Sequence, residues 1–444
     1  MAKRTKSLSK SRKGQKPAGK SPSNKDSPSL GSQSRRITDD PTYEEACRFI
    51  IRLGTAVHGY GPSAARLESF LNRVTDALGY NGVFRSTPSE ITFAFSQRDQ
   101  LWQRTHIAPV PVGGYNMAKL AYVGDLVDKV VSGSLTLNQA TLRLDEIDRM
   151  PSPWGVLTYA LSFFLVGIGF SGLIQGNLWD IGLSGLLSLA VYLLVVLADR
   201  RGERFSDALP FVSAYFAGFC AAGIKLFLPE VNDSVITLSA IVILIPGFAV
   251  SAGIIEIVEN HVVAGSARLM GGLVYLIKQF TGAWLGMATI GLLWTTETTV
   301  IDTGSSEIDT WVFIALLFLG LCFAYQTLLR DFIWVIISCA LSYGGVIISS
   351  TLLSADLGTL FGAVIAGMFA NTWVRLTGRP TSIVLIPAIT VLVSGSIGFR
   401  GLIDAASGQT DQGMDQFMQM FIVALAISAG LLISNTILRP KATL

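Results

Sequence analysis

The sequence is poor in charged residues and in the motifs of catalysis. Only 15% of its 444 residues are Asp, Glu, Lys or Arg, whereas a soluble domain carries about 25%. Half of the residues are hydrophobic and the mean hydropathy is +0.50, which predicts an integral membrane protein with a soluble segment attached. The chain has three histidines and neither a G-x-S-x-G elbow nor a P-loop, so we expect a protein that is not an enzyme.

Cysteine is scarce as well. The four cysteines have neither C-x-x-C nor zinc spacing, and three of them fall in apolar runs, where cysteine packs as a small hydrophobic residue. We therefore expect no metal, no cofactor and no redox role for these residues, which are Cys47, Cys220, Cys322 and Cys339.

The start of the chain has almost no apolar residues. Residues 1–36 hold eleven Lys and Arg but a single acid, Asp26, so this stretch cannot bury a core. It also lacks the apolar region of a signal peptide. We predict a disordered basic tail over residues 1–37 in the cytoplasm. The alternative is that this tail binds anionic lipid head groups. No nucleic-acid partner is expected, because no folded basic patch accompanies the run.

Residues 38–150 are predicted to form a small cytoplasmic α+β domain. Helical spacing of apolar residues indicates one helix from Pro41 to the turn "HGYGP" and a second in "SAARLESFLNRVTDALG". Two strands flank Pro88, "RTHIAPVPV" adds a third, and two more helices follow. We expect His58 and Glu68 to form a buried structural pair in this domain.

Apolar runs of membrane length recur from Pro153 onward. We predict an α-helical polytopic protein with ten membrane spans. These are Val156–Gln175, Leu178–Ala198, Ala208–Leu228, Val235–Ile255, Leu269–Trp294, Trp311–Leu329, Phe332–Leu353, Leu357–Leu376, Thr381–Ile403 and Phe417–Leu438.

Basic residues in the short loops give these spans an orientation. Lys225 and Arg400 alone fall on one side, and the loop Thr295–Thr310 on that side carries four acids and no base. Cytoplasmic loops are rich in Lys and Arg, so we predict that both termini are cytoplasmic. The bases of the other side are Arg200, Arg201, Arg204, Arg268, Arg330, Arg375, Arg379, Arg439 and Lys441.

The second half of the membrane segment repeats the first at an offset of 148 residues, slipping to 149 upstream. A rival offset of 141 would align "LIP" at Leu244 with "LIP" at Leu385. Each half has five spans, and because this number is odd the second half has the opposite orientation in the membrane. We therefore predict two inverted five-helix repeats, residues 153–294 and 311–438, as in many secondary transporters. The matched pairs are Gly247 with Gly395, Gly253 with Gly401, Ile255 with Ile403, Glu256 with Asp404, Gly265 with Gly413 and Met270 with Met418.

Both matched stretches contain a helix break. Pro246 removes a backbone donor, and freed carbonyls within a bilayer persist only where protein or a wet cavity satisfies them. In the second half Ser394 stands in place of the proline. Either break could also be a kink in tightly packed helices. As substrate-binding candidates we take Pro246, Gly247, Ser251, Lys278, Ser394, Gly395 and Ser396.

Three ionisable residues in or near the spans are further candidates. An ion within the membrane is costly and suggests function, so we expect Lys278 to meet a substrate carboxylate, Glu256 or Glu259, unless it extends to the cytoplasmic surface. Glu256 and Asp404 occupy matching positions, which inversion places near opposite membrane faces. They are our candidates for proton coupling or gating.

Several stretches resemble the threonine/serine exporter family over residues 42–438. They include "HGYGPSAARLESFLNRVTDALGY", "STPSEITFAF" and "ILIPGFAVSAGIIEIVENHVVAGSARL". "VSGSIGFRGLID" resembles the family's second half, where Pro-Gly-Ser is usual, but this chain has Ser394-Gly395-Ser396. The resemblance implies export of threonine and serine across a bacterial-type inner membrane, driven by protons.

Two alternatives stay open on the sequence. The same fold could carry another small metabolite such as a dicarboxylate, or the protein could be a membrane-anchored sensor or hydrolase that acts through residues 38–150. A homo-oligomer is compatible with either. Besides membrane lipids, the expected partners are threonine, serine and protons.

Overall fold

The computed structural model describes residues 41–98, 102–110, 114–294, 307–353, 355–392 and 395–439. The predicted basic tail, most of the acidic loop Thr295–Thr310, and Ser394 lie outside the described residues. The chain divides into two compact units, Met1–Glu44 and Glu45–Leu444. Residues 45–149 therefore belong to the same unit as the membrane helices.

Helices and strands follow one another before the first membrane helix as predicted, and we call this part the N-terminal segment. The three strands form one antiparallel sheet in the order β1-β2-β3. Its elements are α1 (Pro41–His58), α2 (Ala64–Ala77), β1 (Tyr80–Ser86), β2 (Glu90–Gln97), β3 (Arg104–Pro109), α3 (Met117–Val131) and α4 (Leu137–Arg149).

The core of the N-terminal segment consists of the residues that the apolar spacing indicates. Ile50 and Leu53 of α1 and Leu71 of α2 are fully buried, and so are Ile91 and Phe93 of β2. Alternate residues of a strand point to the same face, so a single face of β2 packs against the helices. Local pattern was therefore sufficient to predict these elements.

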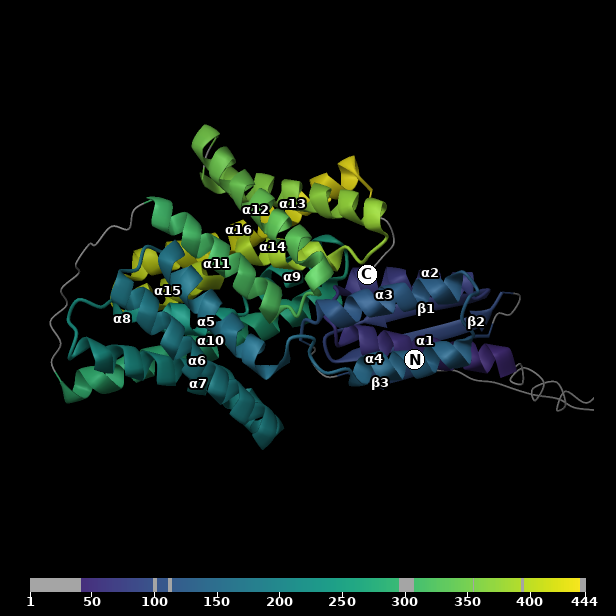
Figure 1. Ribbon diagram of the computed structural model, residues 1–444, viewed down its shortest axis with the longest axis horizontal. Helices are drawn as coiled ribbons and strands as arrows, with labels where there is room; N and C mark the ends of the chain where they lie inside the picture. Colours follow the sequence, from purple (N-terminus) through teal and green to yellow (C-terminus); the bar gives the residue numbers. More distant parts are fainter. Residues whose placement is uncertain are drawn as a thin grey trace, which may run out of the picture. The chain divides into compact units, whose positions relative to one another are not determined.

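Apolar helices make up the rest of the chain (Figure 1). Among the described residues, eight helices are long and apolar enough to cross a membrane, and a bent pair of helices brings the number to nine. A shorter apolar helix covers Thr310–Ala324. The elements are α5 (Gly155–Leu173), α6 (Leu178–Arg201), α7 (Glu203–Lys225), α8 (Asp233–Ile241), η1 (Val242–Leu244), α9 (Gly247–Val258), α10 (Val262–Leu293), α11 (Glu307–Ala324), α12 (Leu329–Leu352), α13 (Ala355–Thr377), α14 (Ser382–Leu392), α15 (Gly395–Ala406) and α16 (Thr410–Ile437).

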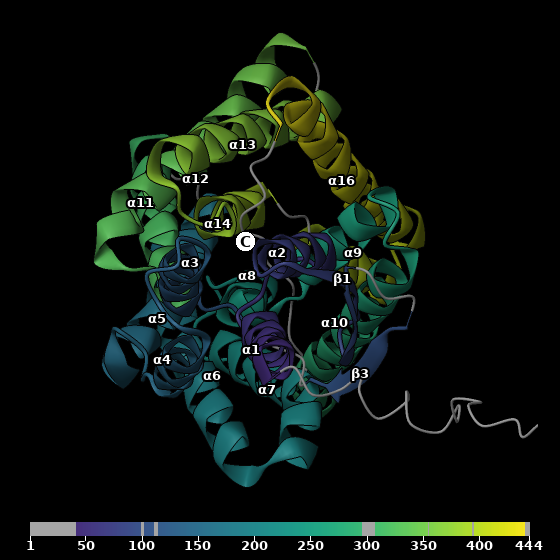
Figure 2. The same ribbon diagram turned by 90° about the vertical axis from the view of Figure 1, so that its right-hand side faces the viewer.

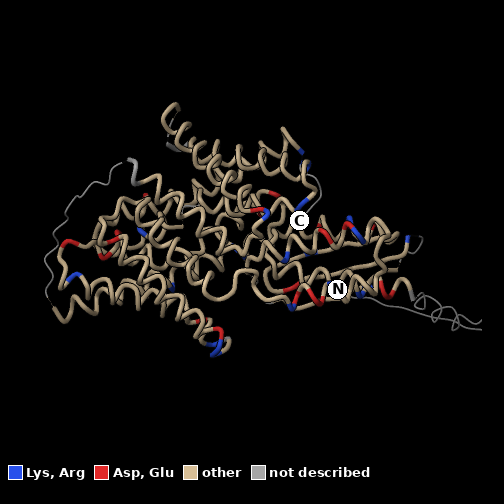
Figure 3. Tube along the Cα trace, in the orientation of Figure 1, with Lys and Arg blue, Asp and Glu red and all other residues tan. Residues whose placement is uncertain are grey.

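Each of the ten apolar runs coincides with one of these helices or with a pair of them. Figure 2 shows α8 and α14, the first parts of the two pairs, enclosed by other membrane helices. Three quarters of the Ser382–Ala406 stretch is buried, a larger share than in any other candidate span. Most of the membrane helices are free of charge along their middle, as Figure 3 shows. The broken helices therefore lie inside the bundle.

The same helix pairs pack together in the two halves. α10 packs on α7 and α9, and α16 packs on the equivalent helices α13 and α15. α6 contacts α8 just as α12 contacts α14, while α5 and α11 pack on each other across the halves. The pairing of helices is thus similar in the two halves.

Candidate functional site

The first helix break lies at Pro246. Ile245 is extended, and α9 starts directly after Pro246. A residue that precedes proline disfavours the helical conformation, and proline has no N–H for the helix. The helical stretches Asp233–Leu244 and Gly247–Val258 consequently meet with a bend of 53°. This bend is the broken span that the sequence predicts.

The predicted second break lies at residues 393 and 394, outside the described residues, within the apolar stretch Ser382–Ala406. Gly395, which follows it, contacts the first break: a Cβ atom on Gly395 would lie 2.6 Å from the Cα atom of Gly247 and 2.9 Å from a methyl carbon of Ile245. A side chain at position 395 would therefore push α15 away from the start of α9. The first N–H groups of a helix lack partners within it and carry partial positive charge, so the start of α9 brings a positive helix end to this contact.

A cavity of about 350 Å³ lies beside this contact. Its walls come from the break at Pro246, from α14 and α15, from α5 and α11, and from Gly114 and Tyr115 just before α3. None of the described residues that line it has a charged side chain. The cavity is therefore apolar except for backbone groups at the helix ends and a few hydroxyl groups.

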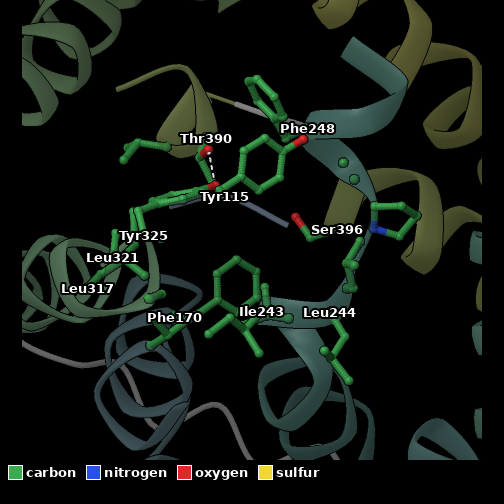
Figure 4. Close-up of a pocket in the computed structure, with 18 of the residues that line it drawn as sticks. Tyr115, Phe170, Ile243, Leu244, Phe248, Leu317, Leu321, Tyr325, Thr390 and Ser396 are labelled. Atoms are coloured by element: carbon green, nitrogen blue, oxygen red, sulfur yellow. Dashed lines mark hydrogen bonds between the residues drawn. The ribbon is translucent and has the colours of Figure 1, made fainter. Parts of the chain in front are cut away.

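Aromatic rings close one side of the cavity. Figure 4 shows Tyr115, Phe248 and Tyr325 together on that side, opposite Ile243 and other apolar side chains. The Tyr115 ring lies edge-on to Phe248 and to Tyr325, with centroids 5.3 and 5.5 Å apart. The Tyr325 hydroxyl lies 2.6 Å from that of Thr390, which itself donates to a backbone carbonyl. Tyr325 must therefore donate to Thr390.

Four of the seven predicted substrate residues line this cavity: Pro246, Gly247, Gly395 and Ser396. Ser251 is buried on α9 but does not line the cavity. Sequence reasoning missed Tyr115, Phe248, Tyr325 and Thr390, because only tertiary packing brings these residues together.

Lys278 lies away from the cavity. It is exposed on α10, and its ammonium donates to the backbone carbonyl of Asp207 at 3.3 Å. Neither Glu256 nor Glu259 is its partner here, so the expected pairing with those acids is wrong. A substrate in the cavity would have to be held by groups other than this ammonium.

Glu256 is instead enclosed by other partners. Its carboxylate is fully buried and accepts a hydrogen bond from the backbone N–H of Ala64 at 2.9 Å. It also pairs with the guanidinium of Arg268 at 3.1 Å. Ala64 is the first residue of α2, where a helix start favours an anion. The acid on α9 therefore links the membrane helices to the N-terminal segment.

Asp404 has an equivalent but uncharged partner. The side-chain amide of Gln416 donates to its carboxylate at 2.8 Å, so both acids meet the residue twelve positions further on. Asp404 is only partly buried. The 148-residue register thus reappears in the contacts as Glu256 with Arg268 and Asp404 with Gln416.

Close glycine contacts follow the same register. A Cβ on Gly253 would lie 2.8 Å from the carbonyl oxygen of Gly265, and one on Gly401 would lie 2.6 Å from that of Gly413. The rival offset of 141 aligns the proline before α9 with Pro387, which lies inside α14. The contacts therefore favour 148.

The expected pair of His58 and Glu68 does not form. His58 Nε2 lies 2.9 Å from the carbonyl oxygen of Thr87. Glu68 is buried, accepts the backbone N–H of Ser86 at 2.9 Å, and lies 3.6 Å from Nδ1 of His261. The end of β1 and the turn after it supply the partners, Ser86 and Thr87, where the sequence suggested a direct contact.

These features define a multi-span helical membrane protein with a cavity beside the helix break at Pro246. A family model described as "Threonine/Serine exporter" matches residues 310–437, and a companion model of the same family matches residues 48–290. The chain belongs to the threonine/serine exporter family.

Curated relatives are similar over most of the chain. "Pheromone-regulated membrane protein 10" of Debaryomyces hansenii is 23% identical over 82% of this chain and 37% of the relative. The protein of that name from Saccharomyces cerevisiae is 22% identical over 88% of this chain and 54% of its own length. This chain thus spans between about a third and just over half of these relatives. No solved structure matches it.

Proposed function

We propose that the protein is a secondary transporter that exports small neutral amino acids, threonine and serine above all, in exchange for protons. The observation that carries this proposal is the uncharged cavity beside the helix break at Pro246, where Gly247 and Gly395 meet. Its volume of about 350 Å³ falls within the range of small-molecule pockets, roughly 300–1,000 Å³. Family membership supports the same cargo.

Helix ends suit the two charges of an amino acid. The N-terminal end of α9 borders the cavity at Gly247, and such an end attracts a carboxylate. Carbonyl groups of η1, whose residues Val242–Leu244 line the cavity, can accept from the ammonium group. The hydroxyls of Ser396 and Thr390 are placed to bond the side-chain hydroxyl of threonine or serine. A neutral zwitterion therefore fits without a charged side chain.

The alternative cargo fits less well. A dicarboxylate brings two negative charges, and burying unpaired charge is costly. The described lining residues offer only helix ends and hydroxyls against it. The third alternative, a sensor or hydrolase in the N-terminal segment, has no supporting arrangement of nucleophile and base among the residues described here. Neutral amino acids are the better proposal.

We further propose that the chain has ten spans arranged as two inverted repeats. The protein would lie in the inner membrane, with both termini in the cytoplasm. The repeated contacts Glu256–Arg268 and Asp404–Gln416 support the internal repeat. Inverted halves can exchange conformations and so expose the cavity alternately to each face. Glu256 and Asp404 would then bind and release the coupled proton as their surroundings change between wet and buried.

Counterflow of labelled threonine in proteoliposomes tests the proposal. Vesicles loaded with unlabelled threonine should accumulate the labelled amino acid, and serine inside should support the same uptake. Accumulation driven by a dicarboxylate but not by threonine would show that the cargo is a dicarboxylate and not threonine. Absence of flux for every solute in a folded protein would contradict transport.

A further inference from the structure

The N-terminal segment contributes a wall of the central cavity. Gly114 and Tyr115 precede α3 and line the cavity together with residues of the membrane helices. The Tyr115 ring packs between Phe248 of α9 and Tyr325 beyond α11. A residue of the N-terminal segment therefore borders the proposed cargo site directly.

Hydrogen bonds hold this wall against the end of α11. The N–H groups of Met117 and Ala118 donate to the carbonyls of Tyr325 and Gln326 at 3.0 and 3.1 Å, and the Asn116 amide donates to the Gln326 side chain at 2.7 Å. Free N–H groups at the start of α3 thus satisfy free carbonyls beyond the end of α11. All of these hydrogen bonds are 3.1 Å long or shorter, so the wall is firmly attached to the end of α11.

A second anchor lies at the start of α2. Glu256 accepts the N–H of Ala64 and pairs with Arg268. The Arg268 guanidinium also lies near the hydroxyl of Tyr115. One buried acid and one arginine therefore connect α2 with the membrane helices beside the Tyr115 wall.

A smaller cavity of about 50 Å³ lies behind Phe248. Phe248 lines both cavities, but the smaller one is lined by the charged residues Arg66, Glu259 and Arg268. Ser382 also lines it, with its hydroxyl buried and without a partner among the described residues. A polar space therefore continues from the central cavity toward the N-terminal segment, interrupted by aromatic rings.

We propose that the N-terminal segment completes the cargo site and forms its gate, with Tyr115 as the cargo-contacting residue that must leave Phe248 before an amino acid can enter. Arg66 and Glu259 flank the entrance and present opposite charges to the carboxylate and the ammonium of that zwitterion. The smaller cavity, at about 50 Å³, is too small to hold an amino acid as it stands. The proposal rests on the proposed transport function and assigns a role to the N-terminal segment within it.

A reversible cross-link tests this gate. In a protein whose four cysteines are replaced by serine or alanine, Asn116→Cys with Gln326→Cys places two thiols where side chains now meet. Oxidation should reduce threonine counterflow to below a tenth of the rate before oxidation, and dithiothreitol should restore it. The matched control is Arg52→Cys with Asp148→Cys, whose side chains meet at 2.8 Å inside the N-terminal segment. Its oxidation should leave counterflow within twofold.

A second readout does not depend on the cargo. Ser396→Cys, added to the Asn116–Gln326 pair, places a thiol in the central cavity. A membrane-impermeant methanethiosulfonate reagent, applied from the face that carries the N-terminal segment, should label it at least tenfold more slowly when the pair is oxidised. Tyr115→Ala should speed this labelling, whereas Tyr115→Phe, which keeps the ring, should change it less.

The two readouts separate the two proposals. If oxidation protects Ser396→Cys but the reduced protein carries no threonine, the cargo assignment fails and the gate stands. If threonine moves and oxidation alters neither its counterflow nor the labelling, the gate is refuted while transport stands.

Discussion

Gly247 and Gly395 bring α9 and α15 into backbone contact, a Cβ on Gly395 having only 2.6 Å to the Cα of Gly247. They are also matched positions at the sequence offset of 148 residues. A contact between matched residues lies on the pseudo-symmetry axis of a repeat, so in the proposed arrangement of two inverted halves this pair marks the point about which the halves are related. The proposed cargo site lies beside it.

Gly395→Ala should therefore impair transport. Inserting a methyl group against backbone costs about 1–3 kcal/mol, and here it displaces α15 from the start of α9 beside the cavity. We expect threonine counterflow to fall about tenfold, the rate equivalent of 1.4 kcal/mol. Gly344→Ala on α12, where a Cβ would meet nothing within 4 Å, is the control. Equal counterflow rates for the two variants would show that the contact between Gly395 and Gly247 is not needed for transport.

Glu256→Gln should uncouple transport from protons. Glutamine keeps a hydrogen-bond acceptor for Ala64 but cannot ionise, and it leaves Arg268 without its charged partner. We expect loss of uphill export driven by a pH gradient, with threonine–threonine exchange retained at reduced rate. Labelled flux with and without the gradient measures the difference. Asp404→Asn should show a related defect, and uphill export at normal rates in both variants would remove these acids from the mechanism.

Acidification should destabilise the protein partly through His58. Burial lowers the pKa of His58 below its ordinary value of 6.5, and Arg268 lowers it further, against the opposing effects of the Thr87 carbonyl and Glu256. As pH falls through 6.5, the unfolded chain binds a proton that the folded chain does not, so stability is lost below that pH until the folded pKa is reached. Thermal unfolding at pH 7.5 and 5.5 should therefore show a smaller decrease for His58→Gln than for the wild type.

Reporter fusions test the proposed orientation. A reporter after Leu444 and one inserted near Lys25 should both give cytoplasmic signals, because the basic loops share one side. A reporter within Thr295–Thr310 should give an external signal. Cytoplasmic signal from that acidic loop would overturn the ten-span arrangement.

Local pattern in the sequence predicted the elements well and their contacts poorly. The strands flanking Pro88 and the break at Pro246 follow from backbone restrictions that act within a few residues, and both were found. Lys278 was chosen because it is a charge within an apolar run, yet Arg268, nearer the start of the same helix, is the residue that meets Glu256. Helical spacing gives the faces of one helix but not the neighbour that covers each face.

The cavity shows the same limit. Tyr115 follows two glycines in a connection before α3, where the sequence indicates only a loop. Its place in the wall depends on hydrogen bonds to Tyr325 and Gln326, more than 200 residues away. Such a contact has no trace in the periodicity of either stretch.

The matched pairs Glu256–Arg268 and Asp404–Gln416 differ in charge. In the proposed inverted arrangement this difference affects the preferred direction of transport. Two identical inverted halves would give the inward-open and outward-open states equal energies, and flux would then show no intrinsic rectification. An ionic contact in one half and a neutral amide in the other removes this degeneracy, and the docking of α2 on Glu256 adds to the bias. The protein would accordingly favour one of the two states at rest. A substitution at residue 268 alone would then change the equilibrium between the inward-open and outward-open states.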